Sequence, residues 1–339
     1  MLISSKSIRQ LADKISGNDE VFCSGLFLSA RWFAVSELDY DGMQLIVLPD
    51  KDSAEYCAAD LYNLIPGDTV FFLPDSGRNI ERSNYKSSLG VQRTSAIGKI
   101  IEYKEGSLTI VTYPSALEEG IPDVDTIRKS LLELTVGEEI SHDEIIESLF
   151  ESGFERVDFV AEPGQFAIRG AIVDIFSYSY NDPFRVSFFG DEIDSINIFD
   201  CNTQLSKEKV QVAEIYPDLV SSSEEESVTV SLTDILPEDT LVWLDSSDMY
   251  KEKSFFEGLS RFRRIYFEVP LSRQTEDPVR FNISPQPSFN KNFELLTEDI
   301  RKRLEEGYRV RIYGEKESQL ERLKAIFSQN GGILPEFMV

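Results

Sequence analysis

The sequence predicts an α/β protein in which a mostly parallel sheet domain is interrupted by a small antiparallel α+β domain and followed by a C-terminal βαβ-type unit. Three observations support this fold class. Residues 1–118 alternate short apolar runs with helical patterns, closely spaced strands joined by turn residues begin near residue 131, and an α/β pattern returns at residue 241. The length of 339 residues is enough for two or three domains.

A parallel sheet is expected in the N-terminal part because strand-like and helix-like runs take turns along the chain. The expected strands are short, apolar and rich in β-branched or aromatic residues: Val21–Leu28, Gln44–Leu48, Thr69–Leu73 and Ser107–Thr112. The helical patterns lie between them, at Ala30–Leu38, Ser53–Leu64 and Ser87–Glu102.

A second domain is expected over residues 121–210. Its helix, Ser141–Glu151, opens with the Ser-x-x-Glu pattern of a capping box, which puts the chain's one histidine, His142, in a first helical turn. The expected strands follow at short intervals and are joined by Gly, Pro and Asn turn residues: Arg156–Ala161, Gln165–Phe176, Phe184–Phe189 and Ser195–Phe199. Such spacing is typical of an antiparallel α+β domain.

The first domain, residues 1–120, is expected to be completed by residues 211–285, where the apolar strand Leu241–Leu244 stands out. Residues 286–339 form the last unit, with a helix, a strand and a second helix expected in turn: Phe293–Glu306, Arg309–Tyr313 and Ser318–Gln329. No closing element follows, so we expect this chain to be the front part of a longer protein.

Composition narrows the classes of function. Sixty acidic residues against 34 basic ones give a net charge of −26, which repels a polyanion and disfavours tight binding of DNA or RNA by this chain alone. Three scattered cysteines and one histidine offer no metal or redox motif, so neither a metal nor another cofactor is expected. No apolar run approaches the roughly 18 residues of a membrane span, and we expect a cytoplasmic protein.

A degenerate nucleotide site is predicted where the first strand turns into a helix. The P-loop pattern G-x-x-x-x-G-K-[ST] aligns from Gly25, but Ala30 replaces the second glycine, Arg31 the lysine and Trp32 the hydroxyl residue that holds magnesium. After the strand Leu241–Leu244, Asp245 is followed by Ser246 in place of a glutamate. Both halves of the site are therefore incomplete, although Asp245 could equally be a helix cap.

A candidate interaction surface lies on the strand Phe184–Phe189. If Val186 and Phe188 face the core, alternation puts Arg185 and Phe189 on the opposite face. An exposed phenylalanine beside an arginine is typical of an interface hot spot. The alternative is that Phe189 packs at the strand end and Arg185 pairs with a local carboxylate, Asp191 or Glu192.

Five ordered segments carry a family resemblance: Ser152–Val157, Glu162–Phe166, Arg169–Phe176, Phe188–Ile196 and Phe199–Gln204. Through them, residues 136–206 resemble the domain shared by the UvrB proteins of nucleotide excision repair and the bacterial transcription-repair coupling factors (Mfd). In both families this domain binds the damage-recognition ATPase UvrA. The resemblance implies that Arg169, Arg185 and Phe189 bind UvrA, with Arg169 reaching the patch from a neighbouring strand.

The broken P-loop, and the absence of a tyrosine-rich hairpin in Phe72–Ser83, make residues 1–285 more similar to the coupling factors. That resemblance implies a helicase-like body without catalysis, which recruits UvrA to stalled RNA polymerase. It also implies that RNA polymerase and DNA are bound, and ATP-driven translocation performed, by domains outside this chain. The alternatives are a UvrB-like ATP-dependent helicase subunit with an unorthodox nucleotide site, and a nucleic-acid-binding module that uses the arginines of the second domain.

Overall fold

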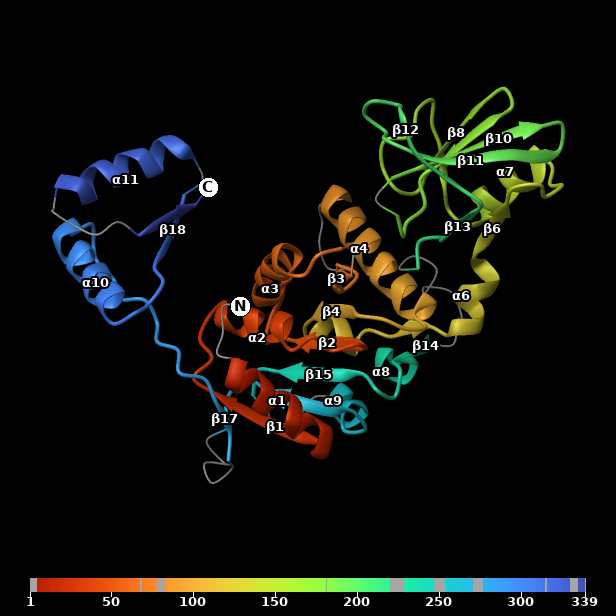
Figure 1. Ribbon diagram of the computed structural model, residues 1–339. Helices are drawn as coiled ribbons and strands as arrows, with labels where there is room; N and C mark the ends of the chain where they lie inside the picture. The colour runs from red at the N-terminus through yellow and green to blue at the C-terminus, as the bar shows by residue number, and fades with distance from the viewer. Residues whose placement is uncertain are drawn as a thin grey trace. The chain divides into compact units, whose positions relative to one another are not determined.

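The computed structural model describes residues 5–67, 69–77, 83–180, 182–219, 229–246, 254–270, 277–314, 316–329 and 335–338 (Figure 1). The chain divides into two compact units, residues 1–283 and residues 284–339. The first unit contains a parallel sheet domain and an antiparallel sheet domain, as the sequence predicts. None of the helices in the described ranges is long and apolar enough to cross a membrane.

A seven-stranded sheet, parallel throughout, forms the body of the first unit. In sheet order the strands are β17 (Val279–Arg280), β1 (Glu20–Ser24), β16 (Arg263–Tyr266), β15 (Leu241–Leu244), β2 (Met43–Val47), β4 (Leu108–Thr112) and β3 (Val70–Phe72). Every residue of β2, β4 and β15 is buried, because helices cover both faces of the sheet. Strands β15 and β16, which follow the inserted domain in sequence, occupy the centre between β1 and β2.

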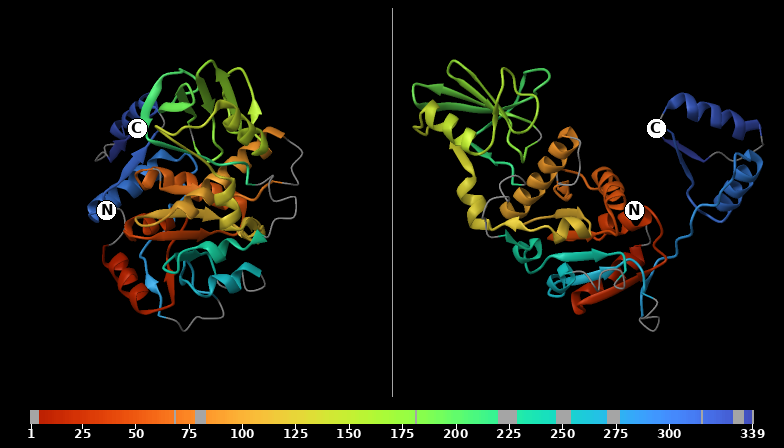
Figure 2. Two further views of the ribbon diagram at one scale, coloured as in Figure 1. Left: turned by 90° about the vertical axis from the view of Figure 1, so that its right-hand side faces the viewer. Right: turned by 180° about the vertical axis from the view of Figure 1, so that it is seen from behind.

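Helices pack against the sheet of the body (Figures 1 and 2), and an apolar cluster lies on each of its two faces. One face is covered by α1 (Ser5–Gly17), α2 (Ala30–Glu37) and α3 (Lys51–Leu64). The other is covered by α4 (Ser83–Glu102), α8 (Leu232–Ile235) and α9 (Ser254–Leu259). Both tryptophans of the chain, Trp32 and Trp243, lie in the first cluster.

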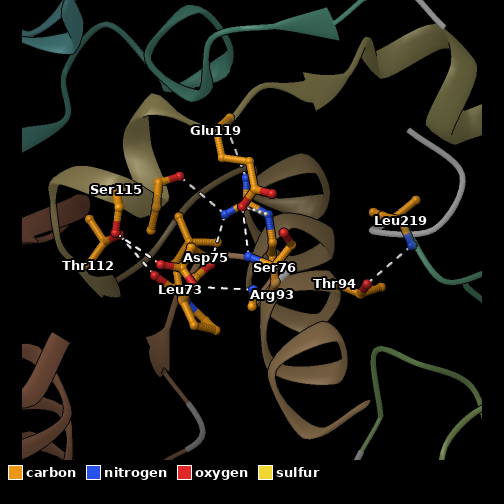
Figure 3. A network of polar contacts seen from close by, with 12 residues as sticks. Leu73, Asp75, Ser76, Arg93, Thr94, Thr112, Ser115, Glu119 and Leu219 are labelled. Carbon is orange, nitrogen blue, oxygen red and sulfur yellow. Dashed lines mark hydrogen bonds and ion pairs between the residues drawn. The ribbon is translucent and has the colours of Figure 1, made fainter. Parts of the chain in front are cut away.

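A buried arginine fixes the loop that follows β3 (Figure 3). The side chain of Arg93, on α4, is 3% exposed and donates to the carbonyl oxygens of Pro74 at 2.8 Å, Ala116 at 3.2 Å and Glu119 at 3.0 Å. The Glu119 carboxylate accepts in turn from the backbone N–H of Ser76 at 2.7 Å. This network ties the loop to α4 and to the end of α5 (Pro114–Glu118).

The inserted domain is built on a six-stranded sheet. In sheet order the strands are β12 (Ser206–Val210), β11 (Glu192–Phe199), β10 (Phe184–Phe189), β9 (Ile172–Ile175), β8 (Gln165–Arg169) and β7 (Glu155–Arg156). All neighbours are antiparallel except β7 and β8. The predicted single strand Gln165–Phe176 is wrong: the chain reverses between β8 and β9 at Gly170, whose φ of 61° a glycine adopts without strain.

One helix covers one face of this second sheet. Helix α7 (His142–Glu151) begins with the predicted capping box between Ser141 and Glu144, and its Ile145 and Leu149 pack in the domain's core. His142 is the first residue of α7, as predicted, and its ring stands edge-on against Phe188 at 4.2 Å between centroids. The opposite face carries a smaller apolar cluster that includes Ala167 and Phe199.

Two short antiparallel ladders join the inserted domain to the body. Strand β6 (Leu132–Thr135) pairs with β13 (Val212–Ile215), and β5 (Ile121–Pro122) pairs with β14 (Thr229–Val230). Between the two ladders lies the short helix α6 (Val124–Ser130), capped by Asp123.

The second unit holds one parallel strand pair, β18 (Arg311–Tyr313) and β19 (Glu336–Met338). Helix α11 (Glu317–Gln329) connects the two strands, and α10 (Phe293–Glu305) precedes them. A parallel pair joined by a helix is a βαβ unit.

Candidate partner-binding surface

Strand β10 presents two faces of opposite character. Val186 and Phe188 are buried in the core under α7, as alternation predicts. Phe189 is 81% exposed. The predicted orientation of this strand is therefore confirmed, and a large aromatic ring lies open to solvent at its end.

A buried carboxylate lies beside Arg185. Asp174 of β9 is the direct cross-strand neighbour of Arg185, and its side chain is only 1% exposed. It accepts two hydrogen bonds from Arg185, at 2.7 Å from Nε and 2.9 Å from Nη2, and a third from Nη2 of Arg169. The carboxylate partner of Arg185 is therefore Asp174, rather than Asp191 or Glu192.

The guanidinium of Arg185 is largely occupied by groups within the domain. Besides Asp174, it donates to Gln204 Oε1 at 2.9 Å and to the Gln204 carbonyl oxygen at 3.4 Å, and it lies 4.1 Å from the centroid of the Phe199 ring. The hydrogen bonds to Asp174 raise the pKa of Arg185. Its side chain is 19% exposed, so it is less accessible than alternation alone suggests.

Arg169 lies on the same face and is more open. It pairs with Ile172, which pairs with Ser187 midway between Arg185 and Phe189 along β10. Its side chain is 36% exposed, and its guanidinium carbon lies 5.0 Å from the centroid of the exposed Phe159 ring. We call Phe159, Arg169, Asp174, Arg185 and Phe189 the arginine–phenylalanine surface.

Two members of this surface, Asp174 and Phe159, are missed by reasoning from sequence. Asp174 falls within a run of apolar strand residues, where the only available signal is that an acidic residue interrupts the run. Phe159 falls in the expected strand Arg156–Ala161, of which only Arg156 belongs to a strand of the structure, β7. Its exposure could not be read from alternation for that reason.

The predicted nucleotide-site residues lie at the carboxyl end of the central parallel strands. Gly25 has a φ of 78°, and a Cβ there would lie 2.1 Å from the carbonyl oxygen of Phe281. The N–H of Phe281 donates to Ser24 O at 2.8 Å. Gly25 therefore permits β17 to approach β1 closely. The chain at the end of β17 occupies one side of this turn.

The structure brings Arg31 and Asp245 together. The Arg31 guanidinium binds the Asp245 carboxylate and also lies 3.2 Å from Glu268. Burial raises the pKa of Asp245, and Arg31 opposes that shift. Trp32, two residues along α2 from Ala30, is buried with its ring edge against Phe267 at 5.6 Å between centroids.

A cavity of about 420 Å³ adjoins the Arg31–Asp245 pair. Its lining combines apolar and hydroxyl residues with the paired charges of Arg31 and Asp245, and it includes Tyr56 and Asp60 on the side of α3 and Ser29 at the start of α2. Ser246 is half-buried beside Asp245. Within the described residues, no group of three or more His, Cys, Asp or Glu side chains could hold a metal ion.

Residues 132–219 match the family model of the UvrB interaction domain. The matched range spans the whole six-stranded sheet and the arginine–phenylalanine surface. By both its fold and this match, the inserted part of the chain is similar to the UvrB interaction domain.

Over 62–80% of its length, the chain is similar to transcription-repair-coupling factors. It is 27% identical to that of Staphylococcus aureus (strain USA300) over 284 residues, which is 80% of this chain and 24% of the relative. It is 30% identical to that of Bacillus subtilis (strain 168) over 217 residues, which is 62% of this chain and 18% of the relative. The matches thus span about a quarter or less of these relatives' length.

Proposed function

We propose that this chain is a non-catalytic docking module that recruits UvrA for nucleotide excision repair at stalled RNA polymerase. The observation that carries the proposal is the exposed ring of Phe189, on the same face as the partly exposed Arg169 in a domain that matches the UvrB interaction domain. Aromatic and arginine side chains of this kind supply most of the binding energy at protein interfaces. Standard interfaces bury about 800 Å² on each partner, which a domain of this size can offer.

Charge supports the same proposal. The chain carries a net charge of −26, yet Arg169 and Arg185 share one buried carboxylate, so the five residues of the arginine–phenylalanine surface together carry one net positive charge. A positive patch in a negative surround favours a partner that presents carboxylates at one place, and it disfavours DNA and RNA, which repel the rest of the chain. This argues against the nucleic-acid-binding alternative.

Replacing Phe189 with alanine is expected to weaken UvrA binding by at least about 1–2 kcal/mol, because an exposed ring contributes to binding and little to folding. The measurement is the Kd for purified UvrA by titration calorimetry. Tyr56→Ala, which removes an exposed ring from α3 of the body, is the matched control and should bind normally. Unchanged binding by Phe189→Ala would put the docking patch elsewhere.

We also propose that the nucleotide site is degenerate and that the body is a helicase-like fold without ATPase activity. Arg31 and Asp245 neutralise each other where an intact site needs a lysine for the phosphates and a free carboxylate near magnesium. The buried indole of Trp32 cannot replace the magnesium-binding hydroxyl. The enzyme alternative draws its support from the cavity of about 420 Å³ at the same place.

Titration with Mg-ATP is expected to show no saturable binding up to millimolar concentration. Binding is measured by tryptophan fluorescence, because Trp32 lines that cavity. The physical reason is that Arg31, the cation among the described residues that line this cavity, is already paired with Asp245 and Glu268. Saturable binding near micromolar that requires magnesium would favour the helicase alternative instead.

In this proposal residues 121–210 are the docking domain, residues 1–120 and 211–285 its body, and residues 286–339 the start of a third domain. RNA polymerase and DNA are bound by parts of the protein that lie outside this chain. Any ATP-driven translocation is also performed by those parts. A repair role of this kind places the protein in the cytoplasm.

A further inference from the structure

A fully buried carboxylate on the outer face of a small sheet needs a physical reason. Asp174 is 1% exposed and sits in β9 on the face away from α7. Removing a carboxylate from water is costly unless it is paired and hydrogen-bonded, and two arginines converge on this one. Buried ion pairs of this type usually add little stability compared with apolar side chains of the same volume. The ion pairs around Asp174 therefore contribute more to ordering the two arginine side chains than to stabilising the fold.

The two arginines use their donors differently. Arg185 commits Nε, Nη1 and Nη2 to Asp174 and Gln204. Arg169 gives one Nη2 hydrogen bond to Asp174, while its guanidinium lies over the Phe159 ring and remains partly exposed. Arg169 thus keeps N–H donors for a partner. Arg185 instead fixes the Asp174 carboxylate, which in turn binds Arg169.

We propose that Asp174 is a positioning residue of the arginine–phenylalanine surface: anchored by Arg185, it fixes the guanidinium of Arg169 in the orientation that binds a carboxylate on the partner. The inference rests on the proposed function and extends it to the chemistry of the contact. A free arginine side chain loses rotamer freedom when it binds, and a side chain ordered beforehand loses less, so binding is tighter. The planar guanidinium forms two parallel hydrogen bonds with a carboxylate only when it is correctly oriented.

The test is a double-mutant cycle on the whole chain, with purified UvrA as the probe. Asp174→Asn keeps the side-chain shape and removes the charge that holds both arginines. It is expected to weaken binding about 10-fold in the wild-type background and less than about 3-fold in the Arg169→Ala background, because contacts that act through one another are not additive. Asp143→Asn, which makes the same charge change on α7 over the other face of the sheet, should leave the Kd unchanged.

Equal weakening in both backgrounds would mean that Asp174 acts on the fold rather than through Arg169, and would overturn the inference. So would unchanged binding by Asp174→Asn. If Asp174→Asn does not fold, Arg185→Lys takes its place in the cycle, since it keeps the charge and loses the two-point contact with Asp174. The same pattern of coupling is expected, and its absence has the same meaning.

A measurement without UvrA separates this inference from the proposed function. In the free protein, NMR relaxation of the arginine Nε–H groups should show Arg169 restricted in the wild type and mobile in Asp174→Asn. Equal mobility in the two proteins would overturn the positioning role. Failure of the wild type to bind UvrA, with Arg169 ordered as expected, would overturn only the proposed function.

Discussion

Replacing Arg93 with alanine is expected to lower the free energy of unfolding of the parallel sheet domain by about 3–5 kcal/mol. The substitution leaves the buried carbonyl oxygens of Pro74 and Ala116, and the part-buried one of Glu119, without their donor. It also leaves the Glu119 carboxylate without the guanidinium 3.7 Å away. The loop after β3 would then lose its attachment to α4, as the contacts in Figure 3 indicate.

Tryptophan fluorescence during urea unfolding measures this effect in the right domain, because Trp32 and Trp243 both lie in the core of the parallel sheet domain. Arg128→Ala removes an exposed arginine from α6 and should change the stability by less than about 0.5 kcal/mol. A loss no larger for Arg93→Ala than for Arg128→Ala would show that the network contributes nothing to stability.

Replacing Arg185 with glutamate is expected to destabilise the inserted domain by about 3–5 kcal/mol, in addition to weakening UvrA binding. The outward orientation of Arg185 on β10 suggests a substitution without consequence for folding. The structure changes this expectation, because a glutamate would face the buried Asp174 across the β9–β10 pair and two carboxylates would share one site. Phe189→Ala is consequently the cleaner test of docking.

Amide hydrogen exchange in β9 and β10 measures this second effect, since it reports the local opening free energy of each strand. Lys209→Glu makes the same change of charge on the exposed edge strand β12 and should leave protection within about 0.5 kcal/mol. Tryptophan fluorescence, which reports only on the parallel sheet domain, should be unaffected by either change. Normal protection of β9 and β10 in Arg185→Glu would mean that Asp174 tolerates a carboxylate neighbour.

The sequence predicts those features that depend on near neighbours along the chain. Alternation correctly assigns the two faces of β10, and the Ser141–Glu144 pattern correctly predicts the start of α7. The mainly apolar segment Gln165–Phe176 misleads for the same reason, because within it Gly170 is the one signal that the chain reverses. The UvrA-binding roles of Arg169, Arg185 and Phe189 came from family resemblance and stay a prediction, which the variants above test.

The local pattern of apolar residues determined the parallel sheet, the antiparallel domain, and an outer face of β10 with an arginine and a phenylalanine. Tertiary structure alone decided that β15 and β16 enter the centre of the sheet. There β15 pairs with β2, which lies about two hundred residues earlier in the sequence. It also decided that Arg93 is buried, that Arg31 closes on Asp245, and that Asp174 joins two arginines. Pairings of this kind depend on which distant segments bury one another's surface and share one another's charges, and no window of neighbouring residues contains both partners.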